Sequence, residues 1–297
     1  MERRLTWGTR SVGQLAYYDR NIGEVGGGNA SRPLARLYGR NARTAQITGL
    51  GTYKYDALQT KLERRFQAGF QLAVAYTFSK NMGIAGNEDG DGSPAIGIPQ
   101  YYFLNRSRTT LDRTHNAQFH GIYELPFGRG KKWASGGASA ALLGGWQFNG
   151  IMSLYSGPPF TITAPGTSLN APGNTQRADL VKPEAAKLGG AGPRQKFYDP
   201  TAFAEVTQVR FGTAGFNLLN SPSTFNTDLS LFRRFRINER VNVQFRAEAF
   251  NATNTPHFAA PNGNVSSSAF MEVSGVRGVG REGIDERMFR LGLRLGF

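Results

Sequence analysis

The stretch that decides the fold is Phe70-Gln71-Leu72-Ala73-Val74-Ala75-Tyr76-Thr77-Phe78. Small or polar side chains alternate here with large ones, namely Phe70, Leu72, Val74, Tyr76 and Phe78. Because successive side chains of a β-strand point to opposite faces, this pattern predicts a strand with one apolar face. Nine such residues, at about 3.3 Å each and tilted by about 45°, span about 21 Å, close to the ~25 Å apolar band of an outer-membrane barrel.

The same alternation recurs along the chain. It is found in residues 54–66, 116–125, 146–154, 224–235, 240–250 and 289–297. We predict a strand for each of these segments, and an eighth, weaker strand within residues 5–18 or residues 43–50. Arg64 and Arg233 interrupt the alternation, and we expect them near a membrane interface, where long cationic side chains can reach water.

The connections between these segments alternate between short and long. The shorter links cover residues 67–69, 126–143 and 236–239. The long, irregular links cover residues 81–113, 157–223 and 251–286. Successive connections of an antiparallel sheet fall at opposite ends, so the pattern collects all the long loops at one end. Short periplasmic turns and long extracellular loops are typical of transmembrane barrels, and Phe297 then falls on the periplasmic side.

A soluble β-sandwich also explains alternating strands, since each of its sheets has one face toward water. It does not predict loops of 33, 67 and 36 residues at one end, because structureless loops beyond about 15 residues are uncommon in compact domains. The mean hydropathy of -0.39 agrees with a barrel, whose strands mix lipid-facing and lumen-facing residues. The sequence therefore predicts an all-β fold, an antiparallel transmembrane β-barrel segment in the outer membrane of a Gram-negative bacterium.

Several motifs resemble those of one family. Residues 53–66, YKYDALQTKLERRF, are similar to the "YNALQ…LERRF" strand of TonB-dependent receptor-like proteins related to the Oar outer-membrane protein. Residues 70–80 resemble the strand that follows it. Other similar stretches are ELPFGRG (124–130), GGWQ (144–147), SGPPF (156–160), DLSLF (228–232) and FRAEAFNATN (245–254). The resemblance covers about residues 50–297.

This resemblance implies a barrel of about 22 strands with an N-terminal plug, energised by TonB for active solute uptake. We therefore expect residues 1–53 to hold a weak first strand and an extracellular loop, and residues 54–297 to be the C-terminal strands of a larger barrel. The first residues show no signal peptide, so we expect a fragment or a truncated reading frame. The alternatives are a structural or adhesive protein without transport and a small stand-alone barrel. The transported solute is not predicted.

Two sets of site residues follow. Charged residues on the polar strand faces are predicted to line the lumen, because an Arg or Lys on the lipid face costs about 2–4 kcal/mol at the membrane midplane; they are Lys61, Glu63, Arg65, Glu124, Asp228, Arg234, Arg246, Glu248, Arg290 and Arg294. Facing inward, they can pair across strands, hold a plug or line a solute path. The C-terminal stripe is similar to the signal read by the barrel assembly machinery; it comprises Phe289, Leu291, Leu293, Leu295 and Phe297.

Other motifs are weaker. The acidic stretch 87–93 resembles a calcium loop, but Asn87 and Ile98 stand where an EF-hand has an acid and a bidentate Glu. Residues 127–132 lack the first glycine and the final Ser or Thr of a phosphate loop, which favours a basic turn. We therefore predict solvated loops at both places, with calcium as the alternative in the first.

No catalytic, metal or cofactor site is predicted. The chain has no Cys, and His115 and His120 fall on opposite strand faces. No nucleophile elbow or paired acids are found, so we do not expect an enzyme. The 35 Lys and Arg residues exceed the 21 Asp and Glu residues, but they are spread along the chain. This favours lipopolysaccharide phosphates over nucleic acid as a partner.

Overall fold

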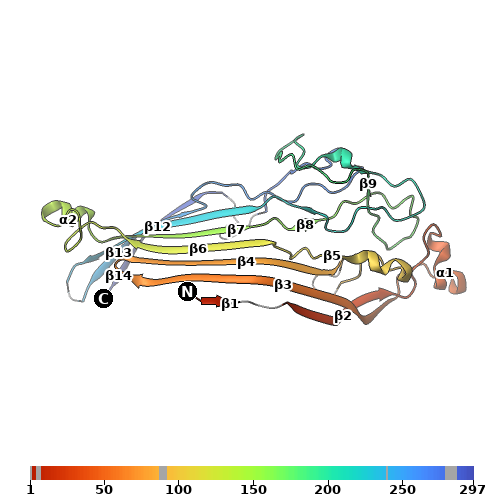
Figure 1. Cartoon of the computed structure of the whole chain (residues 1–297), viewed down its shortest axis with the longest axis horizontal. Coiled ribbons are helices and arrows are strands. Elements are labelled where there is room, and N and C mark those ends of the chain that lie inside the picture. The colour runs from red at the N-terminus through yellow and green to blue at the C-terminus, as the bar shows by residue number, and fades with distance from the viewer. Residues whose placement is uncertain (1, 5–7, 87–91, 239, 278–285) are drawn as a thin grey trace.

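One antiparallel sheet dominates the computed structural model (Figure 1). The structure describes residues 2–4, 8–86, 92–238, 240–277 and 286–297. The sheet strands are β1 (Glu2–Arg4), β2 (Thr9–Asp19), β3 (Ala45–Gln67), β4 (Phe70–Ile84), β5 (Arg106–Arg108), β6 (His115–Glu124), β7 (Trp146–Tyr155), β12 (Thr224–Arg236), β13 (Asn242–Phe250) and β14 (Met288–Gly296). Their order is β1-β3-β4-β6-β7-β12-β13-β14, with β2 also paired to β3 and β5 to β4. The long strands therefore pair in chain order, as in an up-and-down barrel wall.

All seven predicted strands are present, and the eighth is β2, which overlaps the first of the two ranges considered for it and ends one residue beyond it, at Asp19. Residues 43–50 do not form a separate strand: β3 begins at Ala45, so the expected division at residue 53 falls inside β3. Twenty-three residues, at about 3.3 Å each and tilted by about 45°, rise about 54 Å, twice the ~25 Å apolar band. The N-terminal half of β3 thus extends beyond the lipid, where its strand needs no continuous apolar face. That is why its alternation was not recognised.

The turn between β3 and β4 is a two-residue hairpin. Gln67 pairs with Phe70, and between them Ala68 and Gly69 have φ values of 53° and 78°. Two successive positive φ values match the right-handed twist of the flanking strands. The longer link between β6 and β7 contains the short helix α2 (Gly137–Leu143). Both connections lie at the same end of the sheet (Figure 1).

The long connections gather at the opposite end of the sheet, near the labels α1, β8 and β9 in Figure 1. We call the described residues of 20–44, 85–114, 156–223 and 251–287 the loop cap. They contain η1 (Asn29–Ser31), α1 (Pro33–Tyr38), η2 (Pro99–Asn105), η3 (Pro200–Ala202) and the short strand pairs β8 (Pro159–Phe160) with β11 (Leu219–Asn220) and β9 (Asp179–Leu180) with β10 (Phe203–Ala204). The expected asymmetry of turns and loops is confirmed, but the loops are folded rather than irregular.

The two edges of the sheet are formed by β1 with β2 and by β14. Within the described ranges, these edge strands pair only with β3 and β13, so the sheet is open. The described helices are all too short or too polar to cross a membrane.

Candidate functional site

The register of the sheet separates its side chains onto two faces. Residues that pair directly across neighbouring strands share a face. Lys61 lies opposite Ala75, and the same rows continue across β6, β7 and β12 to Glu248, which lies opposite Arg290. We call this side of the sheet the polar face. It carries all ten residues predicted to line a lumen: Lys61, Glu63, Arg65, Glu124, Asp228, Arg234, Arg246, Glu248, Arg290 and Arg294.

Contacts on the polar face run mainly along strands or into the connections. Lys61 Nζ lies 2.6 Å from a carboxylate oxygen of Glu63, two residues further along β3. Glu124 accepts a hydrogen bond of 2.8 Å from Lys131 in the turn after β6. Arg234 and Glu124 line the same hollow of about 290 Å³ at this end of the face. These charges are therefore already engaged locally, while the hollow between them stays open.

Asp228 has a role that the sequence did not indicate. It lies at the loop-cap end of β12, and its Oδ1 accepts hydrogen bonds from the backbone N–H of Asn251, at 2.9 Å, and from Asn226 Nδ2, at 3.1 Å. This carboxylate therefore fixes the start of the connection that follows β13, in addition to lying on the polar face.

The opposite side of the sheet, the apolar face, is covered by large hydrophobic side chains that remain exposed. Leu58, Leu62, Phe78, Phe148 and Leu154 are each between 40% and 48% exposed. The predicted C-terminal stripe continues this surface on β14, where Phe289, Leu291, Leu293 and Leu295 are 63–74% exposed and Phe297 is 98% exposed. A soluble monomer rarely exposes a contiguous apolar surface of this extent. It is the lipid-facing band of a membrane barrel.

Arg64 and Arg233 lie on the apolar face near the turn end. The Arg64 guanidinium is 5.2 Å from the ring centre of Phe70. Arg233 lies over Phe235 at 4.4 Å and donates a 2.7 Å hydrogen bond to the carbonyl of Leu142 at the end of α2. Both guanidinium groups are thus held at a strand end, as expected for residues at a membrane interface.

The loop cap is built around two apolar clusters. One joins the connections after β7 and after β13; it contains Phe160, Ile162, Ala178, Phe197, Tyr198, Ala202, Phe203, Ala214, Phe270, Met271 and Val273. The other joins the connections after β4 and after β7; it contains Ala85, Ile96, Ile98, Leu169, Ala171, Phe211 and Phe216. The signal for these cores was the phenylalanines inside the predicted loops, since solvated loops seldom hold so many. The residues of these clusters do not recur at regular spacing, so alternation along the sequence could not indicate them.

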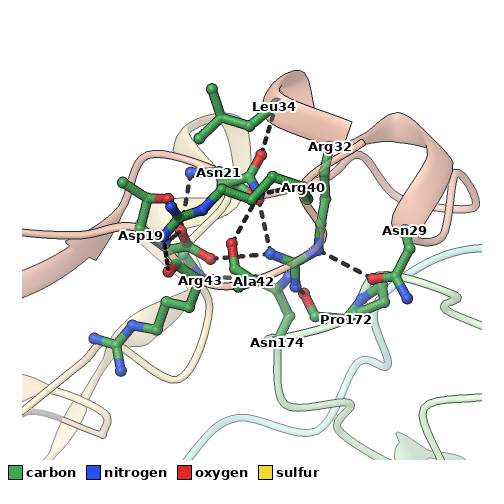
Figure 2. A network of polar contacts seen from close by, with 12 residues as sticks. Asp19, Asn21, Asn29, Arg32, Leu34, Arg40, Ala42, Arg43, Pro172 and Asn174 are labelled. Atoms are coloured by element: carbon green, nitrogen blue, oxygen red, sulfur yellow. Dashed lines mark hydrogen bonds and ion pairs between the residues drawn. The ribbon is translucent and has the colours of Figure 1, made fainter. Parts of the chain in front are cut away.

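A buried polar network joins the first connection to the third (Figure 2). Arg32 Nη1 donates to Asp19 Oδ2 at 3.2 Å and to the carbonyl of Asn21 at 2.8 Å, and its Nη2 donates to the carbonyl of Pro172 at 3.1 Å. Asn21 is fully buried; its amide donates to the carbonyls of Arg40 and Ala42 and accepts from the N–H of Leu34 in α1. The network therefore holds the connection 20–44 folded and ties it to the connection 156–223.

Two ion pairs stabilise the connection 156–223 by joining residues within it. Arg210 donates two hydrogen bonds of 2.7 Å to the carboxylate of Asp179, and they hold the pKa of Asp179 below its usual range. The Lys182 ammonium lies 2.7 Å from Asp199 and, together with Thr201, lowers the pKa of Asp199 to about 2. Bidentate arginine–carboxylate pairs are among the stronger polar contacts in proteins. The loop cap is thus a preorganised surface.

The remaining sequence motifs are dispersed. His115 and His120 lie on opposite faces of β6, as expected, while buried His257 contacts the carbonyl of Phe225 at 2.9 Å. No three His, Asp or Glu side chains come together as possible metal ligands within the part of the chain that the structure describes. Most of the candidate calcium stretch, residues 87–91, lies outside the described residues. What the arrangement offers is a binding surface on the loop cap and a charged face beneath it.

The match to a family model agrees with this geometry. Residues 7–283 match the family model described as "Outer membrane beta barrel domain". A search of curated proteins finds no match. Among solved structures, the outer membrane transporter YddB from Escherichia coli is similar, with a TM-score of 0.49 and 8% sequence identity over 97% of this chain. The chain spans 29% of the length of that transporter.

Proposed function

The chain belongs to the outer membrane β-barrel domain family and resides in the outer membrane, and from this premise we propose that it is the C-terminal part of a TonB-dependent receptor for active solute uptake. The loop cap recognises the solute at the cell surface. The polar face lines the path through the lumen and contacts a plug outside this chain. No catalytic step belongs to the proposal.

The folded loop cap is the observation that carries this proposal. A barrel that only anchors itself in lipid needs short, solvated connections. Here the connections after β4, β7 and β13 bury two apolar clusters between them. Loops with built cores hold recognition groups in place, and preorganisation reduces the entropy lost on binding.

The polar face supports the second half of the proposal. Ten charged residues on one side of a membrane sheet are costly unless that side is wet or covered by protein. The sheet described here has unpaired edges, and a strand edge is not stable in lipid. We propose that further strands close the barrel and that the TonB system acts through its plug.

Two more partners belong to the proposal. The exposed stripe that ends at Phe297 is recognised by the barrel assembly machinery during insertion. The surplus of Lys and Arg meets the phosphates of lipopolysaccharide, which surround an outer-membrane barrel at the cell surface.

The test compares cells that make the complete protein with cells from which the region encoding residues 54–297 is deleted. Uptake of a panel of labelled solutes is measured with and without a protonophore, alongside attachment of the cells to surfaces. We expect uptake of one solute class to fall on deletion and on addition of the protonophore. Binding of that solute to the cell surface should persist when the protonophore is present. Unchanged uptake of every solute, combined with reduced attachment, would instead establish the adhesive alternative.

A further inference from the structure

Arg177 is a buried cation that lacks the partners expected of one. It lies in the connection after β7 and is 6% exposed. Its Nε is fully buried and has no hydrogen-bond partner, and its guanidinium forms no ion pair with any residue that the structure describes. The charged group lies over the ring of Phe216, 5.4 Å from the ring centre. Burial lowers the pKa of Arg177, and no acidic residue in the described part of the chain counters that effect.

A second arginine of the loop cap shows what a satisfied site looks like. Arg32 is also 6% exposed. Its guanidinium donates to the side chains of Asn29 and Asp19 and to the carbonyls of Asn21 and Pro172. A buried charge without such partners costs free energy, so buried cations are normally paired. At equal burial, Arg32 has these partners and Arg177 does not.

The backbone around Arg177 is rigid. Its carbonyl lies against Gly212, where a Cβ atom would come within 2.1 Å of that oxygen. The side chain of Gln176, which is 2% exposed, accepts from the N–H of Gly212 and donates to the carbonyl of Arg210. Residue 177 also forms a β-bridge with Thr163. The backbone that carries the Arg177 side chain is therefore held by segments on both sides and does not belong to a free loop.

We propose that Arg177 binds an oxyanion group of a ligand, namely a carboxylate, phosphate or sulfate. The Phe216 ring lies beside the guanidinium, whose planar fork of N–H groups can bind two oxygens at once. The small exposed fraction means that few waters compete for these donors, so the bond gains strength from the low local dielectric. The proposal rests on the proposed function in one respect: the oxyanion group is taken to be part of the solute that the loop cap recognises.

The test uses the complete protein, including the strands proposed to close the barrel, folded in detergent. Inorganic sulfate and acetate are separate probes, each titrated calorimetrically at constant ionic strength set by chloride. The variants are Arg177→Met and, as a matched control, Arg106→Met, which removes an exposed arginine of the same loop cap. We expect one sulfate or acetate site in the parent chain, weakened about 10- to 100-fold in Arg177→Met, as for loss of a charged hydrogen bond. Arg106→Met retains the parent affinity. Arg177→Lys keeps the charge without the fork and binds at intermediate strength.

Stability separates this role from a structural one. In anion-free buffer, Arg177→Met unfolds at the parent temperature or above it, because an uncompensated buried charge has been removed. Equal anion affinity in the parent and Arg177→Met chains, no anion site in the parent, or destabilisation of Arg177→Met regardless of anion would each overturn the assignment. Purified lipopolysaccharide is added as a competitor: displacement of sulfate identifies a lipid phosphate as the occupant, and no displacement identifies a free solute. Anion binding without uptake would refute the proposed function alone.

Discussion

Replacing Arg32 with Met gives a demanding test of how the loop cap is held together. The side chains of Arg32 and Asp19 are only 7% and 11% exposed, and their 3.2 Å contact lies at the centre of the network in Figure 2. Methionine has a similar length but donates no hydrogen bonds. The substitution therefore removes four donated hydrogen bonds while largely preserving the packing.

The structure sets the size of the effect. Removing one partner of a buried ion pair costs about 3–5 kcal/mol. Here Asp19 retains two backbone donors, Asn21 N–H at 2.9 Å and Thr44 N–H at 2.8 Å, which stabilise the remaining carboxylate. We therefore expect the lower end of that range, about 3 kcal/mol, or roughly 100-fold more frequent local opening.

Hydrogen–deuterium exchange on the complete protein in detergent measures this opening peptide by peptide. We expect residues 20–44 and the segment around Pro172 to exchange about 100-fold faster, while β12 and β13 are unchanged. Arg36→Met is the matched control, because Arg36 is an exposed arginine of the same helix α1. Adding Asp19→Asn to Arg32→Met then completes a double-mutant cycle.

Two results would refute this reasoning. Equal exchange in Arg32→Met and Arg36→Met would mean that the buried network does not hold the first connection. Faster exchange spread evenly over the whole sheet would mean that the loop cap and the sheet open as one unit, not as separate units.

Three further predictions concern the apolar stripe, the chain end and pH. Leu291→Arg places a charge on the lipid face and destabilises the inserted protein by about 2–4 kcal/mol. Gly292→Arg, on the polar face one residue away, has a much smaller effect. Urea unfolding in lipid vesicles compares the two variants, and equal losses of stability would contradict the assignment of faces. Deleting Phe297 slows assembly into vesicles that contain the purified assembly machinery, but it does not slow spontaneous insertion into vesicles without it. Equal slowing in both kinds of vesicle would mean that Phe297 is needed for folding and not for recognition by the machinery. The pKa of Asp199 is lowered from its usual 3.8 to about 2, mainly by Lys182, so its stabilising contribution is present above about pH 4 and is lost as the pH falls toward 2; exchange of the surrounding segment should show this loss in the parent but not in Lys182→Met.

The strands were predictable because their signal is local. In residues 70–78, large apolar side chains occupy every second position, and this is enough to place a strand and its apolar face. The pairing register seen in the structure keeps like faces together, since a slip of one residue would bring Lys61 and Arg246 into lipid. The start of β3 was missed because, beyond the membrane, Ala45 to Tyr53 need not alternate.

The loop cap could not be predicted in the same way. Phe216 and Ile96 meet in one cluster, yet they are far apart in the chain and neither belongs to a periodic segment. Which phenylalanines pack together, and which polar groups bond inside them, depends on how three connections fold against each other. Composition could show only that the long loops contain phenylalanines, not which of them pack together.

The sequence by itself determined the membrane strands, their two faces and the separation of turns from long connections, because each depends on a period of two residues and on the high cost of charge in lipid. Tertiary structure alone decided the partners of buried polar groups. Arg32 and Arg177 are the same residue type in two different loops, but only the folded connections bring acceptors to the first and place the second beside Phe216. Hydrogen bonds act over about 3 Å, so only three-dimensional proximity could reveal which arginine is satisfied and which is open to a ligand.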